Sequence, residues 1–473
     1  MTRPKTDFSL VTTACLSMGL ALISLCASNR SQAGEAAAPE TTTLFTHVNV
    51  VPMDSERVLR DQSVLVEAGT IKAIGRSLTA PPQAHIIDGH GSEYLSPGLA
   101  DMHVHSDNRR DMAVYLANGV TTILNMGGAR AGFIDLTRPA VNRGELPGPH
   151  IYAGLMVDGT PEYGNLFVTT PEEARAVAHI AQTNGYDFIK VYNNLTPECF
   201  QALIDAGRTQ GLPVIGHGVS QVGLERQLAA GQLLVAHTEE YIYTVFFPPG
   251  SDSGTRPPKL EQIPAAIAFT KRSGAFVTAD LITYTTIASQ WGKPAAVDDF
   301  MKLPEVRYLD LEDRVRWLDS GYAQRSGDIQ ERLAFLKVFT KAMAEAGIPL
   351  VTGTDAPGIP GLVPGFSLHQ DLQALERAGL TRYQVLSAAT RTPGELIARA
   401  KPTAQLFGTV TAGYRADLIL TASNPLENLT ALGKPQGVMV QGHWRDAKEL
   451  QGLLDSVAQK YAAATQRSLH TAP

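Results

Sequence analysis

The sequence has few cysteines and no excess of basic residues. Only three of its 473 residues are cysteine. Two of these, Cys15 and Cys26, fall in an apolar N-terminal stretch, so the rest of the chain keeps only Cys199 and can form no internal disulfide. The formal net charge is -6, and no run of Lys or Arg offers a face for a polyanion. These absences exclude a disulfide scaffold and argue against nucleic acid, which leaves a small molecule or a short peptide as the expected partner.

The N-terminal stretch has the pattern of a signal peptide over residues 1–33. Arg3 and Lys5 precede an apolar run over 8–27, and Ser31 and Ala33 place small residues where a signal peptidase cuts. A membrane anchor is the alternative, but four Ser and Thr residues interrupt the run. A lipoprotein site is weaker, because neither cysteine follows the usual Leu-small-small approach. We expect cleavage near Ala33, a linker over 34–43, no stable membrane span afterwards, and a periplasmic or secreted protein.

The pattern of predicted secondary structure in the rest of the chain changes at residue 97. Before it, short strands over 44–51, 63–67 and 71–74 indicate a small β-module. After it, apolar strands alternate with helical patterns, which is typical of βαβ units around a parallel sheet. Eight strands are expected, over 98–105, 120–125, 150–157, 187–192, 212–217, 233–237, 275–280 and 349–355. The count favours a closed (β/α)8 TIM-like barrel over residues 97–400, of the α/β class.

Helix signals separate several of these strands. Residues 171–184 form one predicted helix, and 196–209 form another with Thr196 as N-cap and Pro197 in the first turn. Beyond residue 355 helices are expected over 368–378, 381–389 and 392–400. Strands then return over 408–410, 416–420 and 437–444. We therefore expect a β-sandwich built from 44–96 and 401–446, followed by a helix and tail over 447–473.

Two histidines close the first strand of the predicted barrel. They end the run Ser96-Pro-Gly-Leu-Ala-Asp-Met-His-Val-His105, and residues at i and i+2 of a strand point to the same side. His103 and His105 therefore bring two nitrogen donors toward one point. The alternative is a half-buried strand with alternating polar positions.

Lys190 lies late in the fourth predicted strand, in Asp187-Phe-Ile-Lys-Val-Tyr192. An ammonium among apolar neighbours is costly to bury, so such a lysine deprotonates or finds a partner. A neutral lysine amine can take up carbon dioxide, and the resulting carbamate can bridge two cations. The alternative is a side chain that reaches out to solvent at the strand end.

Three more polar side chains follow apolar runs in the same way. His217 ends the fifth strand and His237 the sixth, where each could be a ligand or a hydrogen-bonded core residue. Asp355 ends the eighth; it could cap the next turn or act as a general acid/base. In a β/α barrel the carboxyl ends of the strands meet at one mouth, so these side chains together predict a metal site.

These residues resemble those of the metal-dependent amidohydrolase superfamily. The resemblance includes Pro97-Gly98-Leu-Ala-Asp101 before the two histidines and Gly413-Tyr-Arg-Ala-Asp417-Leu-Ile after the barrel, and covers nearly the whole mature chain. Within the superfamily the chain is similar to the imidazolonepropionase-like and prolidase-like group. By that resemblance His103 and His105 bind the more buried metal, a carboxylated Lys190 bridges both, and His217 and His237 bind the more exposed one. Asp355 would then be a ligand and the general base.

The expected cofactors are two divalent cations, with zinc favoured because the ligands are nitrogen and oxygen without thiolate. Such cations acidify a bound water and polarise a carbonyl. The resemblance implies an exported binuclear hydrolase of amide bonds in peptide-like or N-acyl amino acid substrates. The alternatives are a cyclic-amide, lactone or ester hydrolase on the same site, and a non-catalytic barrel subunit. Val191-Tyr-Asn-Asn194 stands where some dipeptide-binding relatives have a Gly-rich stretch, which counts against dipeptide specificity.

Several residues around the site have open roles. Tyr192 has the strand parity to face the mouth and could donate a hydrogen bond to substrate, or could be an ordinary aromatic at the rim. Glu239 and Glu240 could orient a ligand or form a solvated turn. His369 is expected to pack rather than bind metal. The segments 241–260 and 281–345 could form a lid, an apolar specificity wall or an oligomer contact, and we expect a homo-oligomer.

Overall fold

The computed structural model describes residues 42–162, 166–247 and 254–470. The predicted signal peptide over 1–33 lies outside these residues, as does most of the linker. Within the part of the chain that is described, no helix combines the length and the apolar character needed to cross a membrane.

A ring of parallel strands forms the larger part of the structure. Neighbours are paired in the order β14-β13-β12-β11-β10-β8-β7-β6, and the two-residue β9 (Leu166–Phe167) pairs with β8. The ring strands are β6 (Leu99–Val104), β7 (Val120–Asn125), β8 (His150–Asp158), β10 (Phe188–Val191), β11 (Val214–Gly216), β12 (Leu234–Val235), β13 (Phe276–Thr278) and β14 (Leu350–Val351). The predicted eight-stranded barrel is confirmed.

The barrel closes between its first and last strands through backbone hydrogen bonds. The Met102 N–H donates to the Thr352 carbonyl at 2.9 Å, and the Asp355 N–H donates to the His103 carbonyl at 2.8 Å. Since parallel strands share one direction, closure brings all eight carboxyl ends to a single mouth. Six of the eight strands are shorter than the sequence predicts, so His217, His237 and Asp355 lie just beyond strand ends.

The barrel helices begin and end where the sequence indicates. Thr170 caps α3 (Pro171–Thr183) with a capping box, and Thr196 caps α4 (Pro197–Gln210), which stops at Gly211 in the left-handed region. The remaining helices of the outer layer are α1 (Arg109–Ala117), α2 (Arg138–Asn142), α5 (Leu224–Ala230), α6 (Ile263–Ser273), α7 (Leu281–Gln290), α10 (Gln330–Glu345), α11 (Phe366–Arg377), α12 (Arg382–Ala389) and α13 (Arg391–Ala400).

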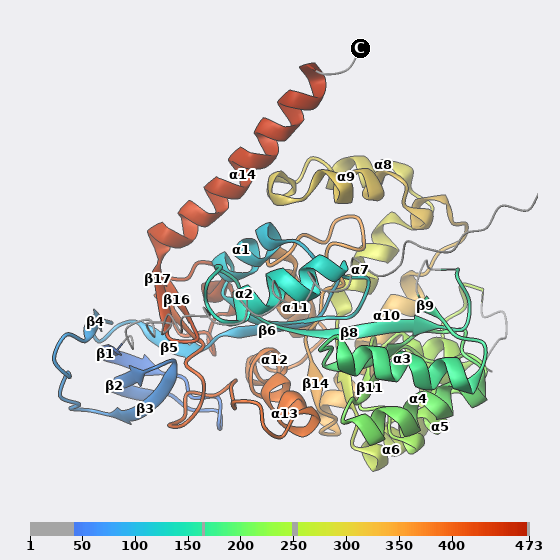
Figure 1. Cartoon of the computed structure of the whole chain (residues 1–473), viewed down its shortest axis with the longest axis horizontal. Helices are drawn as coiled ribbons and strands as arrows, with labels where there is room; N and C mark the ends of the chain where they lie inside the picture. Colours follow the sequence, from blue (N-terminus) through green and yellow to red (C-terminus); the bar gives the residue numbers. More distant parts are fainter. Residues whose placement is uncertain (1–41, 163–165, 248–253, 471–473) are drawn as a thin grey trace, which may run out of the picture. The chain divides into compact units, whose positions relative to one another are not determined.

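A second, mixed sheet is built from both ends of the chain, as predicted. Its strands are β1 (Thr42–Val50), β2 (Leu59–Glu67), β3 (Thr70–Gly75), β4 (His85–Asp88), β5 (Tyr94–Pro97), β15 (Leu418–Thr421), β16 (Gly437–Val440) and β17 (His443–Asp446). The antiparallel pairing of β5 with β15, in register Leu418 to Pro97, joins the N-terminal and C-terminal parts. Figure 1 shows the blue and red strands of this sheet. Because β6 follows β5 almost directly, the sheet holds the entry to the first barrel strand.

Two details of the predicted C-terminal strands are wrong. The single strand expected over 437–444 is a hairpin of β16 and β17, because Gln441 and Gly442 both have positive φ, 52° and 81°, as a tight turn requires. Residues 408–410 form no strand; the Val410 N–H donates instead to the Pro52 carbonyl at 3.0 Å.

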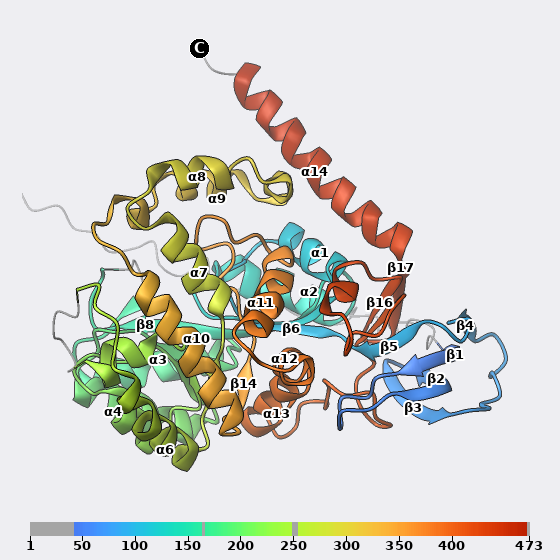
Figure 2. The same cartoon turned by 180° about the vertical axis from the view of Figure 1, so that it is seen from behind.

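The segment between β13 and β14 carries two helices beyond the barrel pattern, α8 (Pro294–Phe300) and α9 (Leu311–Leu318). Both views of the molecule place them on the side opposite α6 and α13 (Figure 2). Trp317 of α9 is fully buried, and its Nε1–H donates to the Pro357 carbonyl at 2.9 Å. The loop that carries Asp355 therefore anchors α9. The last helix, α14 (Ala447–His470), packs on α1 through Val457 and Tyr461.

Candidate metal centre

The paired histidines and the predicted aspartate meet at the barrel mouth. Nε2 of His103 lies 3.3 Å from Oδ1 of Asp355, and Nε2 of His105 lies 3.0 Å from the same oxygen. His103 is fully buried at the end of β6, whereas His105 is partly exposed. Together the three side chains form a group whose donor atoms lie close enough to hold one cation.

Lys190 lies inside the barrel on β10, with no exposed surface. Its Nζ lies 3.3 Å from Sδ of Met156 and 4.6 Å from the ring centre of Tyr192. Because burial disfavours the ammonium, it lowers the pKa of Lys190 to about 8. The side chain does not reach out to solvent, so the neutral amine is accessible near neutral pH.

His217 and His237 follow β11 and β12 and face the first pair. Their ring centres lie 5.1 Å apart, and the His237 ring stacks on His103 at 4.2 Å. The His217 ring centre is 6.4 Å from that of His103. The structure thus brings all six side chains expected at a metal site to one end of the barrel.

All four histidines use Nδ1 in a hydrogen bond to an oxygen. Nδ1 of His103 donates to the Ala236 carbonyl at 3.1 Å, and Nδ1 of His105 donates to the Gly127 carbonyl at 2.9 Å. The other two donate to carboxylates. Nδ1 of His217 donates to Glu240 at 2.5 Å, and Nδ1 of His237 donates to Asp280 at 2.5 Å. A proton on Nδ1 leaves the lone pair on Nε2, the arrangement found in histidines that ligate metals.

The two carboxylates behind the histidines were not assigned from the sequence. In the sequence, Asp280 is only the end of the seventh predicted strand. Glu240 is compatible with an orienting role or with a solvated turn; in the structure it is buried, and its second oxygen accepts the Gly218 N–H at 2.9 Å. Its neighbour Glu239 is half-buried, and burial raises its pKa to about 8. The available signal was position alone, since both buried acids directly follow strands that end in the mouth.

Burial and neighbouring charges shift the pKa values of the side chains in the centre in opposite directions. Burial and the nearby Lys190 lower the pKa of His217 to about 4. Burial opposes protonation of His237 as well, but the Asp280 carboxylate outweighs it and raises the pKa of His237 to about 10. Burial also works against the ionised form of Asp355, yet the hydrogen bond and charge of His105 hold its pKa well below the usual range. His237 is therefore a strong base toward a proton or a metal cation.

Tyr192 lies at the rim with its ring centre 4.1 Å from that of His217. Its strand parity places it on the wall of the cavity above the centre. His369 lies elsewhere on α11, where its Nε2 bonds to the Asn118 carbonyl at 2.9 Å, consistent with a packing role.

A cavity of about 560 Å³ opens above the centre. The barrel contributes His105, Tyr192, His217, His237 and Asp355 to its lining, and the segment around α9 contributes Asp310, Glu312, Asp313, Arg316 and Tyr322. Of the roles left open for 281–345, an apolar wall does not fit this lining, because the segment supplies mainly charged side chains. Of the segment 241–260, none of the described residues lines the cavity.

Comparison with known proteins agrees with this architecture. The model of the amidohydrolase family matches residues 94–445. An ochratoxinase from Aspergillus niger is 23% identical over 449 residues, covering 85% of each chain. A solved bottromycin amidohydrolase superimposes with a TM-score of 0.69 at 23% identity, covering 89% of this chain and 90% of its own. A putative prolidase from Bifidobacterium longum superimposes with a TM-score of 0.63 at 22% identity, covering 88% of this chain and 99% of its own.

Proposed function

This chain belongs to the amidohydrolase family, whose members hydrolyse carbon–nitrogen bonds, and from that premise we propose that it does so with two divalent cations. The observation that carries the proposal is the common orientation of its four histidines. Each has Nδ1 engaged with an oxygen, so each presents Nε2 at the barrel mouth.

The donor set fits two cations. Nε2 of His103 is buried, and the described residues offer it no hydrogen-bond partner, as expected for an atom that serves a metal. We assign His103, His105 and Asp355 to one cation, and His217 and His237 to the other. A carbamate on Lys190 would supply an oxygen to each. Nitrogen and oxygen donors without thiolate favour zinc.

Bound divalent cations supply an acidified water as nucleophile and polarise the scissile carbonyl. In this chain, Asp355 accepts the proton of the attacking water and delivers it to the departing nitrogen, the general acid/base role of a carboxylate. Tyr192 lies where its hydroxyl can donate a hydrogen bond to a substrate carbonyl or carboxylate. Glu240 and Asp280 hold the imidazoles in the required tautomer.

For the substrate we propose an amide of a peptide-like or N-acyl amino acid compound. Two of the similar structures are named as an amidohydrolase and a prolidase, which supports an amide over a lactone or ester. The cavity of about 560 Å³ is large enough for a compound of dipeptide size or somewhat larger.

The experiment is a substrate panel on the purified mature chain. Dipeptides, N-acyl amino acids, cyclic amides and lactones are each offered to the zinc-loaded protein, with Asp355→Asn as the inactive control. We expect turnover of linear amides that the variant lacks. Turnover of lactones alone would assign the site to ester chemistry, and no turnover of any class would favour a binding subunit.

We also propose that the protein is exported with cleavage near Ala33. Residues 1–33 carry the sequence pattern that supports this. N-terminal sequencing of the protein from its native host should begin at residue 34, and an intact Met1 would contradict export by cleavage.

A further inference from the structure

A buried carboxylate away from the metal centre faces the same cavity. Asp111 lies in the first turn of α1, where the Asn108 side chain accepts the N–H groups of Arg110 and Asp111 at 2.9 and 3.1 Å. Asp111 is 1% exposed, and no donor among the described residues meets full hydrogen-bond geometry at either carboxylate oxygen, although the side chains of Ser106 and Asn108 lie near enough to favour its ionised form. Nevertheless it lines the cavity above the centre. A buried acceptor without a partner is rare and points to a missing ligand.

A second acid, Asp313, lines the same cavity. Asp313 of α9 is 7% exposed, and its Oδ1 pairs with Nη1 of Arg316 at 3.1 Å. Burial, with the charge of Asp313 added, raises the pKa of Asp111 to about 8. The other ionisable groups around Asp111 are Asp310, Arg110, Tyr115 and, from α14, Tyr461. An incoming positive charge would relieve this crowding of acids.

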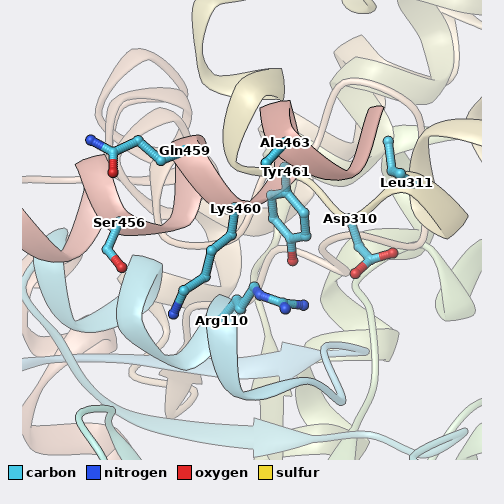
Figure 3. A pocket seen from close by; sticks show the side chains of 8 residues that line it. All are labelled: Arg110, Asp310, Leu311, Ser456, Gln459, Lys460, Tyr461 and Ala463. Atoms are coloured by element: carbon cyan, nitrogen blue, oxygen red, sulfur yellow. The ribbon is translucent and has the colours of Figure 1, made fainter. Parts of the chain in front are cut away.

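The wall that carries Asp313 is fixed in place. Trp317 anchors α9 to the loop after Asp355, and Asp310 caps the helix by accepting the Glu312 N–H at 3.0 Å. Asp310 also faces a neighbouring pocket of about 360 Å³, where α14 lies across α1 (Figure 3). There Tyr461 stands over Arg110, with the guanidinium carbon 5.2 Å from the ring centre. Packing on both sides therefore holds the acids in position without a ligand.

The charges of the cavity do not balance. Away from the metal centre, five carboxylates line it against the guanidiniums of Arg130 and Arg316. Arg130 pairs with Asp107 at 2.7 Å, and Arg316 pairs with Asp313. These pairs leave over the fully buried Asp111, which its raised pKa keeps largely protonated near neutral pH and which releases its proton when a cation binds. A lining with excess negative charge attracts cationic ligands and rejects anionic ones.

We propose that Asp111, with Asp313 in the lining of the same cavity, binds a positively charged group of the substrate, so that the amide entering this cavity carries a primary ammonium or a guanidinium. The inference rests on the proposed function, because it places the cationic group in the cavity of the reacting centre. An organic cation fits better than a third metal ion. The cavity is of substrate size, and Arg316 beside Asp313 would repel a divalent cation more strongly than a singly charged organic cation.

A binding experiment tests the subsite without catalysis. Butylguanidinium chloride and the neutral N-butylurea are titrated into the zinc-loaded protein by calorimetry. We expect the wild type to bind the guanidinium at least about 10-fold more tightly, as a buried charge-assisted pair allows. Asp111→Asn should lose that preference, and Asp313→Asn should reduce it. Asp298→Asn, on the exposed face of α8, is the matched control and should keep it.

Hydrolysis of matched substrates separates this inference from the proposed function. Amides that differ only in lysine against norleucine should show a lysine preference of about 10-fold in kcat/KM, which Asp111→Asn reduces below about 3-fold. If the protein binds butylguanidinium but hydrolyses no amide, the subsite is supported and the proposed function is rejected. If it hydrolyses amides without preferring lysine over norleucine, the proposed function is supported and the subsite is rejected. Equal binding of both probes by the wild type, or calcium binding at Asp111 in their place, overturns the subsite.

Discussion

Nδ1 of His237 lies 2.5 Å from Oδ2 of Asp280, and both side chains are buried. The acid belongs to the strand next to that of the histidine, so the barrel itself creates the pair. Because Asp280 accepts the Nδ1 proton, the Nε2 lone pair of His237 faces the centre. This contact decides whether the ring acts as a ligand or as an ordinary buried histidine.

Replacement of this acid should weaken metal binding. We expect Asp280→Asn to lower the affinity of the second cation by about 10-fold to 100-fold, as removal of such partners does in other metal sites. Titration against a chelating dye measures the affinity. Asp205→Asn, exposed on α4, is the control. Unchanged affinity in Asp280→Asn would show that His237 needs no partner to ligate.

Lys190 is expected to join the two cations. Lys190→Ala should lose most of the bound metal and the hydrolytic activity, because it removes the only group assigned to both. Elemental analysis after gel filtration measures the metal content, and Lys341→Ala on α10 serves as control. Two metals per chain and full activity in Lys190→Ala would refute the bridge.

Asp355 carries the proton in the proposed reaction. Asp355→Asn should reduce kcat by about 10²-fold to 10⁴-fold, the usual contribution of general acid/base catalysis, with any further loss coming from weaker metal binding. Steady-state kinetics at saturating zinc separates these two effects. A variant that retains wild-type kcat would assign the proton transfer to another group.

Asp111 should make stability depend on pH. Its folded pKa of about 8 lies above the ordinary value of 3.8, so between these values the folded state holds a proton that the unfolded state has released. Stability therefore falls as pH rises through this window, by up to about 1.4 kcal/mol per pH unit for one such group. Asp111→Asn should abolish this loss of stability with pH, because an amide does not titrate.

Denaturant unfolding at pH 5, 6, 7 and 8 measures this effect. The advantage of Asp111→Asn over the wild type should grow with pH, while Asp298→Asn should follow the wild type. Parallel profiles for Asp111→Asn and the wild type would show that Asp111 is ionised or solvated in the folded protein.

The sequence predicted the barrel and the six side chains because both follow local rules. Apolar runs mark the strands, and a polar residue directly after each run must lie at the mouth. For Asp280 and Glu240 the same rule gives a place near the mouth but no role, because the role depends on which imidazole lies across the strand gap. Asp111 and Asp313 were missed for a similar reason. They lie about 200 positions apart, and only the fold brings them into the lining of one cavity.

The most direct measurement is the metal content of the purified chain, taken together with its amide hydrolysis before and after chelation. We predict two divalent cations per chain, loss of hydrolysis when they are removed and recovery when zinc is restored. Undiminished amide hydrolysis by a metal-free chain would contradict the proposal that these histidines serve two cations.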